Sequence, residues 1–316
     1  MDSFLRVSLR GARRATRQSF FRDCFVTTFL AMTLTYISTA FAYDETHPPT
    51  IEDFNRAIAI NPNSADAYFD RGMLWEKQGN LSQAIADFSQ TIRINPQDVQ
   101  AIYSRGNVYV ELNDLTQAIT DYTKVIELDP QDASVYYNRG LTYDRQGNTV
   151  AAITDFTQAI KINPDYAESY HNRGLVWNKV GNLTQAITDL NRAIELDPKL
   201  AEAYYNRGII FDKQGKFIDA INDFSKAIQL NPDYAESYAN RGEIYVQQDD
   251  FAQARFDFTK AIELNPKVPE AYNNRAICYY KLKQYPKAWD DLQKAIELGY
   301  AVDAGLIAMV KKACKK

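Results

Sequence analysis

The sequence predicts an all-α protein, an α-solenoid of seven 34-residue helix-turn-helix repeats with an N-terminal half repeat and a C-terminal capping helix. The first observation is periodicity, because Asn-Arg-Gly blocks return every 34 residues, at 138–140, 172–174, 206–208 and 240–242. The second is that small residues and a proline recur at fixed positions of each repeat. A repeat of this length cannot bury its own apolar faces, so neighbouring repeats must stack to form the core.

The composition excludes several other classes of protein. Of the 316 residues, 46% are hydrophobic and only 13 are Gly and 11 Pro, so the chain is neither disordered nor collagen-like. The net charge is −4, although residues 1–42 hold six arginines and only two acids. The rest of the chain is therefore more acidic than the whole, which argues against nucleic acid as a partner. Three Cys and two His are too few for a disulfide scaffold or a clustered zinc site, and no cofactor is expected.

The first 42 residues have the pattern of a signal peptide. Their arginines precede an uncharged run over residues 24–43, and Ala40-Phe41-Ala42 supplies the small residues that a signal peptidase needs. We expect cleavage after Ala42 and export to the periplasm or the extracellular space. One alternative is an uncleaved anchor over residues 24–43, which is about 20 residues and can span a bilayer; membrane contact is expected only in that case. An Arg-rich organelle transit sequence is the other alternative.

The repeat register divides the rest of the chain. A linker over residues 43–49 contains two prolines, and a half repeat over residues 50–64 opens with a capping box at Thr50 and Asp53. Residues 303–316 form a capping helix with a basic tail. Between them lie the seven full repeats, at residues 65–98, 99–132, 133–166, 167–200, 201–234, 235–268 and 269–302.

Five positions of each repeat explain the two helices and the turns. Position eight is Gly in six repeats and Ala276 in the seventh, and position twenty is Ala in all seven, so the two helices can approach closely. Aromatic residues at position eleven, such as Trp75 and Tyr143, are expected to fill the space beside them. Proline at position thirty-two ends the second helix in six repeats. A left-handed cap is expected at position fifteen, where four repeats carry glycine: Gly79, Gly147, Gly181 and Gly215.

This pattern resembles the tetratricopeptide repeat (TPR) family over residues 65–302. The resemblance implies that the first helices line a concave groove. Position six of that surface is Asn in five repeats, beside aromatic residues at position five. A carboxamide can donate to and accept from a peptide backbone, so this series of asparagines, one in each of five successive repeats, suits an extended peptide. The alternative is that these asparagines satisfy helix–helix contacts. The candidate groove residues are Tyr103, Tyr137, Asn138, His171, Asn172, Tyr205, Asn206, Asn240 and Asn274.

A second ladder is expected to be structural. Position seven is Arg in all seven repeats, and position twenty-three is Asp in all seven. The two positions lie on facing helices, where a bidentate ion pair fixes the register. The expected pairs join Arg105, Arg139, Arg173, Arg207 and Arg241 to Asp121, Asp155, Asp189, Asp223 and Asp257.

The function predicted from the sequence is a non-catalytic scaffold or adaptor that binds an extended peptide or partner protein in the groove. No H-E-x-x-H, G-x-S-x-G or P-loop motif occurs, so an enzyme is not expected. Two alternatives remain open. One is self-association as an assembly factor, which requires the apolar face of residues 302–314 to be exposed, and the other is a role as the targeting subunit of a separate enzyme. A bridge between Cys278 and Cys314 is also left open.

Overall fold

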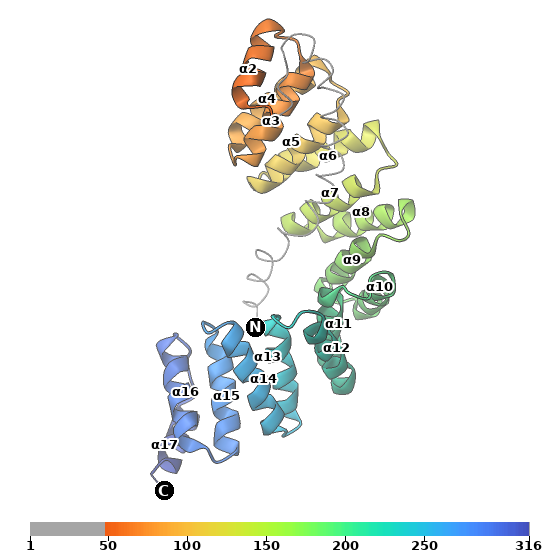
Figure 1. The fold of residues 1–316 in the computed structure, drawn as a ribbon. Coiled ribbons are helices and arrows are strands. Elements are labelled where there is room, and N and C mark those ends of the chain that lie inside the picture. Colours follow the sequence, from red (N-terminus) through yellow and green to blue (C-terminus); the bar gives the residue numbers. More distant parts are fainter. Residues whose placement is uncertain (1–47, 316) are drawn as a thin grey trace. The chain divides into compact units, whose positions relative to one another are not determined.

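The structure is a computed structural model that describes residues 48–315, and every regular element in that range is an α-helix. The chain divides into two compact units between Asp129 and Pro130. Within each unit, consecutive helices pack against each other in chain order (Figure 1). The prediction of an all-α solenoid is confirmed. The expectations for the signal peptide and most of the linker fall on residues 1–47, outside the described residues.

Unit 1 contains five described helices: α2 (Ile51–Ile60), α3 (Ala65–Lys77), α4 (Leu81–Ile94), α5 (Val99–Glu111) and α6 (Leu115–Leu128). Unit 2 contains the remaining eleven: α7 (Ala133–Gln146), α8 (Thr149–Ile162), α9 (Ala167–Lys179), α10 (Leu183–Leu196), α11 (Ala201–Lys213), α12 (Phe217–Leu230), α13 (Ala235–Gln247), α14 (Phe251–Leu264), α15 (Pro269–Lys281), α16 (Tyr285–Glu297) and α17 (Ala304–Ala313). None of the described helices is long and apolar enough to serve as a transmembrane span.

Local sequence signals set the helix ends. The Thr50 hydroxyl accepts a hydrogen bond from the Asp53 amide, and the Asp53 carboxylate accepts one from the Thr50 amide at 2.8 Å, which confirms the capping box. The predicted left-handed turn residues are confirmed at position fifteen, as at Gly147 with φ of 88°. The same conformation occurs at Asn113, Asp249 and Lys283, which occupy position fifteen of the three repeats without glycine there. Glycine alone therefore identified four of the seven left-handed turns at position fifteen, and the other three could be located only from the repeat register.

The core of each repeat forms where its two helices meet. The alanines at position twenty are fully buried, and an added Cβ at Gly208 would lie 2.9 Å from Cε1 of Phe224. Position eight is small because the side chain at position twenty-four covers it. The aromatic residues at position eleven are partly buried and pack on the clusters that contain the position-twenty alanines, as expected, while position twenty-four covers position eight itself. The residues at position twenty-four are fully or almost fully buried: Phe88, Tyr122, Phe156, Leu190, Phe224, Phe258 and Leu292.

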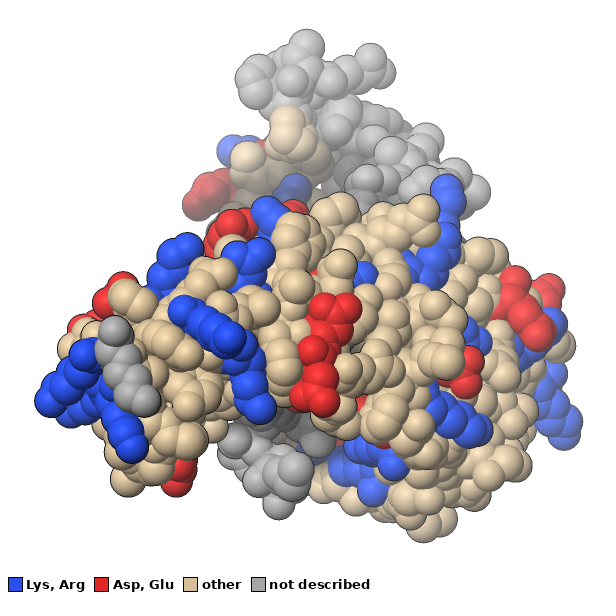
Figure 2. Space-filling model, turned by 90° about the horizontal axis from the view of Figure 1, so that it is seen from below, with Lys and Arg blue, Asp and Glu red and all other residues tan. Residues whose placement is uncertain are grey.

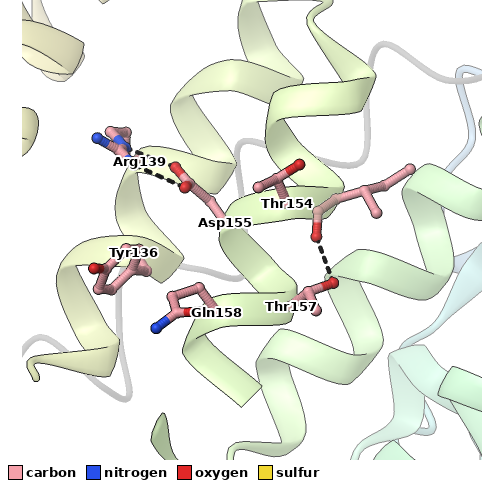
Figure 3. A pocket seen from close by; sticks show the side chains of 7 residues that line it. Tyr136, Arg139, Thr154, Asp155, Thr157 and Gln158 are labelled. Carbon is pink, nitrogen blue, oxygen red and sulfur yellow. Dashed lines mark hydrogen bonds and ion pairs between the residues drawn. The ribbon is translucent and has the colours of Figure 1, made fainter. Parts of the chain in front are cut away.

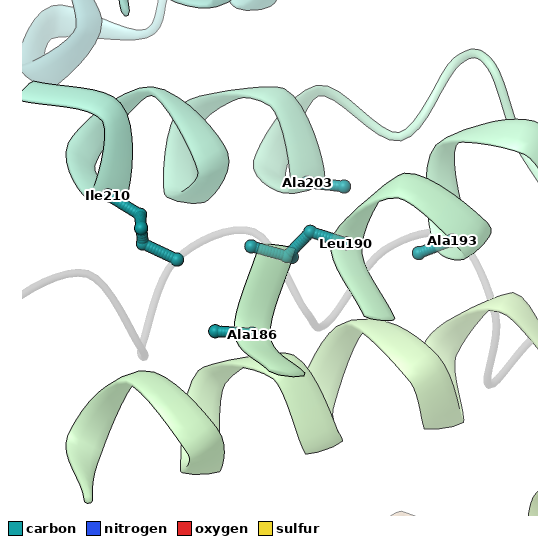
Figure 4. Close-up of a cluster of buried hydrophobic side chains, with 5 residues drawn as sticks. All are labelled: Ala186, Leu190, Ala193, Ala203 and Ile210. Carbon is teal, nitrogen blue, oxygen red and sulfur yellow. The ribbon is translucent and has the colours of Figure 1, made fainter. Parts of the chain in front are cut away.

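Consecutive repeats share a second layer of core. Figure 4 shows this layer between α10 and α11, where Leu190 of one repeat faces Ile210 of the next. Both side chains are fully buried. The repeats of unit 2 are therefore joined by continuous apolar packing, as the stacking argument requires.

The last helix, α17, covers the end of unit 2. Val310 is fully buried against Ala288 and Leu292, and Leu306 and Ile307 pack on the same cluster. Lys311 lies over the Trp289 ring, with 4.9 Å between Nζ and the ring centroid. In the structure, α17 packs the apolar face that self-association was expected to use against its own repeat array.

Candidate functional site

Arg and Asp side chains link the two helices of every repeat. Nε and Nη2 of Arg207 donate to the two carboxylate oxygens of Asp223 at 2.8 and 2.7 Å. All seven repeats have this bidentate pair, and the Asp side chains in it are at most 9% exposed. The structure brings together each Arg and Asp that the sequence paired.

In six repeats the third arm of the guanidinium reaches the preceding repeat. Nη1 of Arg207 donates to Asn191 Oδ1 at 2.7 Å, and Nη1 of Arg241 donates to Ser225 Oγ at 2.8 Å. We call the Arg, its Asp and this acceptor the arginine spine. Sequence reasoning missed the acceptor, although position twenty-five always carries a side-chain oxygen: Asn55, Ser89, Thr123, Thr157, Asn191, Ser225, Thr259 and Gln293.

Tyrosine rings and open pockets border the arginine spine. The Arg139 guanidinium lies over the Tyr136 ring, 5.8 Å from its centroid, and five other repeats show the same contact. Figure 3 shows Arg139 and Asp155 facing each other beside a pocket that Thr154, Thr157 and Gln158 also line. A similar pocket surrounds Arg173 and Asp189. Since the charged groups of each pair neutralise one another, these pockets present no unpaired charge from the spine.

The predicted groove residues lie on first helices. In unit 2, α7, α9, α11, α13 and α15 contact each other in sequence. We call their side chains at positions two, five, six, nine, twelve and thirteen the first-helix face. It includes every candidate groove residue except Tyr103, which lies on α5 of unit 1 and packs on Tyr122 with 5.8 Å between ring centroids.

The asparagines at position six bridge neighbouring first helices. Asn172 Nδ2 donates to Tyr137 Oη at 3.0 Å, and Asn240 Nδ2 donates to Tyr205 Oη at 3.1 Å. Asn206 Nδ2 lies 3.1 Å from His171 Nε2. Asn274 instead donates to Glu243 Oε1 at 3.2 Å. Each contact joins one repeat to the previous one, as the helix–helix interpretation of these residues required.

These contacts change what the ladder can offer a ligand. Nδ2 of Asn172 also donates to the Glu168 carbonyl at 2.8 Å, and Nδ2 of Asn206 to the Glu202 carbonyl at 2.7 Å. Both hydrogens of the Asn172 amide are therefore used, as are those of Asn206 in the His171 tautomer whose Nε2 carries no proton, so in this arrangement neither amide is available to donate to a peptide. Among residues 48–315, no donor bonds the Oδ1 of Asn172, Asn206 or Asn240. The face consequently presents acceptors, on half-buried side chains at Asn206 and Asn240 and on a side chain that is only 6% exposed at Asn172.

Tyrosines of the face stack in pairs. The rings of Tyr205 and Tyr234 are 4.6 Å apart between centroids, and those of Tyr137 and Tyr166 are 5.0 Å apart. Burial, with Glu236 adding a smaller contribution, raises the pKa of Tyr205 to about 12. The hydroxyl therefore stays protonated at neutral pH and can accept from Asn240 while keeping a proton to donate.

Elsewhere on the surface, positively and negatively charged side chains are mixed. On the side drawn in Figure 2, Lys and Arg lie in separate groups among uncharged side chains and some acids. The described residues contain no group of His, Cys, Asp and Glu suited to a metal ion. Cys278 is buried and Cys314 exposed, and both are free thiols. Burial raises the pKa of Cys278 to about 12, so this thiol is unreactive at neutral pH.

Comparison with protein families gives the chain its classification. A model described as TPR repeat matches residues 106–147 and 178–215. Two models described as tetratricopeptide repeat match residues 40–101, 133–166, 201–234, 235–268 and 269–298. The chain belongs to the tetratricopeptide repeat family. A search of curated proteins finds no match.

Solved structures share this fold. MamA is 26% identical, with a TM-score of 0.51 over 55% of this chain and 96% of that chain. YrrB, described as a TPR protein with an unusual peptide-binding site, is 23% identical, with a TM-score of 0.51 over 60% of this chain and 97% of that one. The C-terminal part of a TPR protein from Cytophaga hutchinsonii is 19% identical and has a TM-score of 0.63 over 76% and 98%.

Proposed function

We propose that this TPR protein is a non-catalytic scaffold that binds an extended segment of a partner protein along the first-helix face. One observation carries the proposal: Oδ1 of Asn172, Asn206 and Asn240 recurs once per repeat and has no donor among the described residues. The amides of an extended backbone supply such donors at regular intervals. Each bond contributes about 1 kcal/mol net, so burial against the tyrosines must add to them. The description of YrrB as a peptide-binding TPR protein supports the same use of this fold.

The test compares two triple variants that remove equal numbers of contacts between repeats. The first is Asn172→Ala, Asn206→Ala and Asn240→Ala on the first-helix face. The matched control is Asn191→Ala, Ser225→Ala and Thr259→Ala, which removes three acceptors of the arginine spine. Both variants lose inter-repeat hydrogen bonds, but only the first loses the free acceptors.

Random 16-residue peptides displayed on phage would be selected on the wild-type chain, and the affinity of the selected peptides measured by fluorescence polarisation. We expect the asparagine variant to bind at least tenfold more weakly and the control to stay within twofold. Failure to select any peptide, or equal losses in both variants, would overturn the proposal.

We also propose that the scaffold works outside the cytoplasm, on the strength of the sequence of residues 1–42. Fusion of residues 1–48 to alkaline phosphatase, an enzyme active only after export, tests this directly. Phosphatase activity and a mature N-terminus at Tyr43 are expected. An intact N-terminus in the membrane fraction would instead indicate the anchor, and an inactive fusion would contradict export.

A further inference from the structure

Charged groups on the first-helix face are satisfied unequally. Its lysines have partners, since Lys179 Nζ lies 3.1 Å from an oxygen of Asp144 and Lys213 Nζ 3.3 Å from Asn178 Oδ1. Lys281 lies over the Phe251 ring, 5.3 Å from its centroid. Five carboxylates on the same face form no ion pair with any residue between 48 and 315: Glu202, Asp212, Glu236, Glu243 and Glu270. The uncompensated charge of the face is therefore negative, although its composition is mixed.

These carboxylates lie close enough to repel one another. Although the Glu243 side chain is exposed, partial desolvation by its surroundings raises its pKa above the ordinary value, and the charges of Asp212 and Glu270 raise it further, while the bond from Asn274 opposes them. Burial also raises the pKa of Asp212. A cation placed among them would gain from several carboxylates at once.

A pair of stacked tyrosines lies among these carboxylates. Glu202 and Glu236 both act electrostatically on Tyr234, and Glu236 and Glu243 act on Tyr205, so the pair lies among these carboxylates. Aromatic rings beside carboxylates are a recognised environment for cationic side chains. Arginine fits best, because its planar guanidinium can stack on a ring while its N–H groups bind a carboxylate.

The tyrosine pair occurs twice, two repeats apart. Residues 163–170 and 231–238 have the identical sequence NPDYAESY. Tyr166 and Tyr234 in these segments stack on Tyr137 and Tyr205 with interplanar angles of 37° and 36°. The repeats between and after them have no such ring pair, because Leu200 and Val268 replace the second tyrosine.

The spacing of the two tyrosine pairs sets the spacing of a ligand. Neighbouring packed helices lie about 8–10 Å apart, so first helices two repeats apart are separated by roughly 20 Å. An extended chain advances about 3.3 Å per residue and covers this distance in about six residues.

We infer that the first-helix face of unit 2 binds a basic extended segment, in which Arg or Lys side chains about six residues apart each contact one tyrosine pair. The side chain at Tyr205 and Tyr234 also contacts the nearby carboxylates of Glu202, Glu236 and Glu243. This rests on the proposed function and adds the chemistry of the partner to it. The free Oδ1 atoms hold the backbone of the segment, and the tyrosine pairs and these glutamates select its side chains.

The test uses the full chain and fluorescein-labelled synthetic 14-residue peptides of Gly, Ser and Ala. One peptide carries two Arg six residues apart, a second carries them three residues apart, and a third carries two Glu six residues apart. We expect the first peptide to bind at least tenfold more tightly than the other two. Its affinity should fall as NaCl rises from 50 to 300 mM, because ion pairs at an exposed face are screened.

Two charge-matched variants locate the effect. Glu202→Gln, Glu236→Gln and Glu243→Gln remove three carboxylates from the face, whereas Asp233→Asn, Glu263→Gln and Glu297→Gln remove three from exposed positions elsewhere in unit 2. Circular dichroism checks that both fold. The face variant should bind the first peptide at least tenfold more weakly and the control within twofold.

The outcomes separate this inference from the proposed function. Equal losses in both variants, or no preference for six-residue spacing, would overturn the inference as non-specific charge attraction. If the phage-selected peptides bind through the asparagines but show no enrichment in Arg or Lys, the inference fails and the proposed function stands. If no peptide of any charge binds, both fail.

Discussion

The arginine spine and the first-helix face share the first helices but differ in how their polar groups are satisfied. In the spine, Arg207 uses Nε, Nη1 and Nη2 on Asp223 and Asn191, all within the protein. On the first-helix face, Asn206 uses only its amide hydrogens, and Glu236 has no ion-pair partner within residues 48–315. Within each repeat, the positions of the arginine spine therefore contribute to stability, whereas those of the first-helix face keep polar groups available for recognition.

The largest effect is expected where the spine is broken. Asp257→Ala would leave the Arg241 guanidinium without its bidentate partner, and Asp257 is only 1% exposed. Removing one partner of a buried pair costs about 3–5 kcal/mol. Because repeat arrays unfold locally, amide exchange should accelerate most in α13 and α14, as mass spectrometry would show. Unchanged protection there would mean that the pair does not stabilise the repeat.

A smaller, pH-dependent effect is expected at Asp70, where an acid stands at the position that is Asn in five repeats. Burial, with Asp66 adding to it, raises the pKa of Asp70 to about 7 from 3.8. Its contribution to stability is therefore fully present below about pH 4 and is lost as the pH rises to 7. Asp70→Asn should raise stability at pH 8 by at least about 1.4 kcal/mol, the equivalent of one pKa unit, and should change it little at pH 4.

Thermal unfolding at the two pH values measures this effect. Glu127→Gln, an exposed change in the same unit, is the control and should leave the pH dependence unaltered. Equal stabilisation by Asp70→Asn at pH 4 and pH 8 would show that titration of Asp70 is not the cause.

Removing a single acceptor of the spine should cost less than breaking an ion pair. Ser225→Ala deletes the bond from Arg241 Nη1 but keeps both bonds to Asp257. A hydrogen bond to a charged group contributes about 1.5 kcal/mol or more, although water can replace part of it here. We expect the free energy of unfolding, measured by chemical denaturation, to fall by about 1 kcal/mol. A fall as large as that of Asp257→Ala would show that the ion pair depends on the bond between repeats.

The smallest effect is expected on the first-helix face. Glu243 has a raised pKa, so its contribution to stability is lost as the pH rises above its ordinary 4.5. Glu243→Gln should therefore raise the melting temperature slightly at pH 8, by about a degree or less because the side chain is exposed. A clear loss of stability would indicate that Glu243 is structural, and would remove it from the recognition surface.

The sequence predicted the features that depend on residues within one period. Pro at position thirty-two, Ala at twenty and the Arg–Asp pair recur too regularly to be missed. Contacts between repeats were harder to foresee, because Asn206 meets His171 35 residues away and Arg207 meets Asn191 16 residues away. The repeat pattern shows that both positions are constrained, but it does not show which donors and acceptors bond to each other. For that reason the bonds of the asparagines could not be assigned, while the oxygen-bearing series at position twenty-five was a usable signal.

The charge of the first-helix face also depended on the structure. Its acids and lysines were visible in the sequence, but only the pairing of Lys179 with Asp144 and of Lys213 with Asn178 showed which sign is left over. The tyrosine pairs likewise join Tyr205 to Tyr234 across most of one repeat.

The most direct measurement of the division between the two regions is hydrogen–deuterium exchange of the full chain, with and without the peptide that carries two Arg six residues apart. Protection is predicted in the first helices α7, α9, α11 and α13, with α8, α10, α12 and α14 changing little. Equal protection of both sets, or protection confined to the second helices, would contradict the assignment of recognition to the first-helix face.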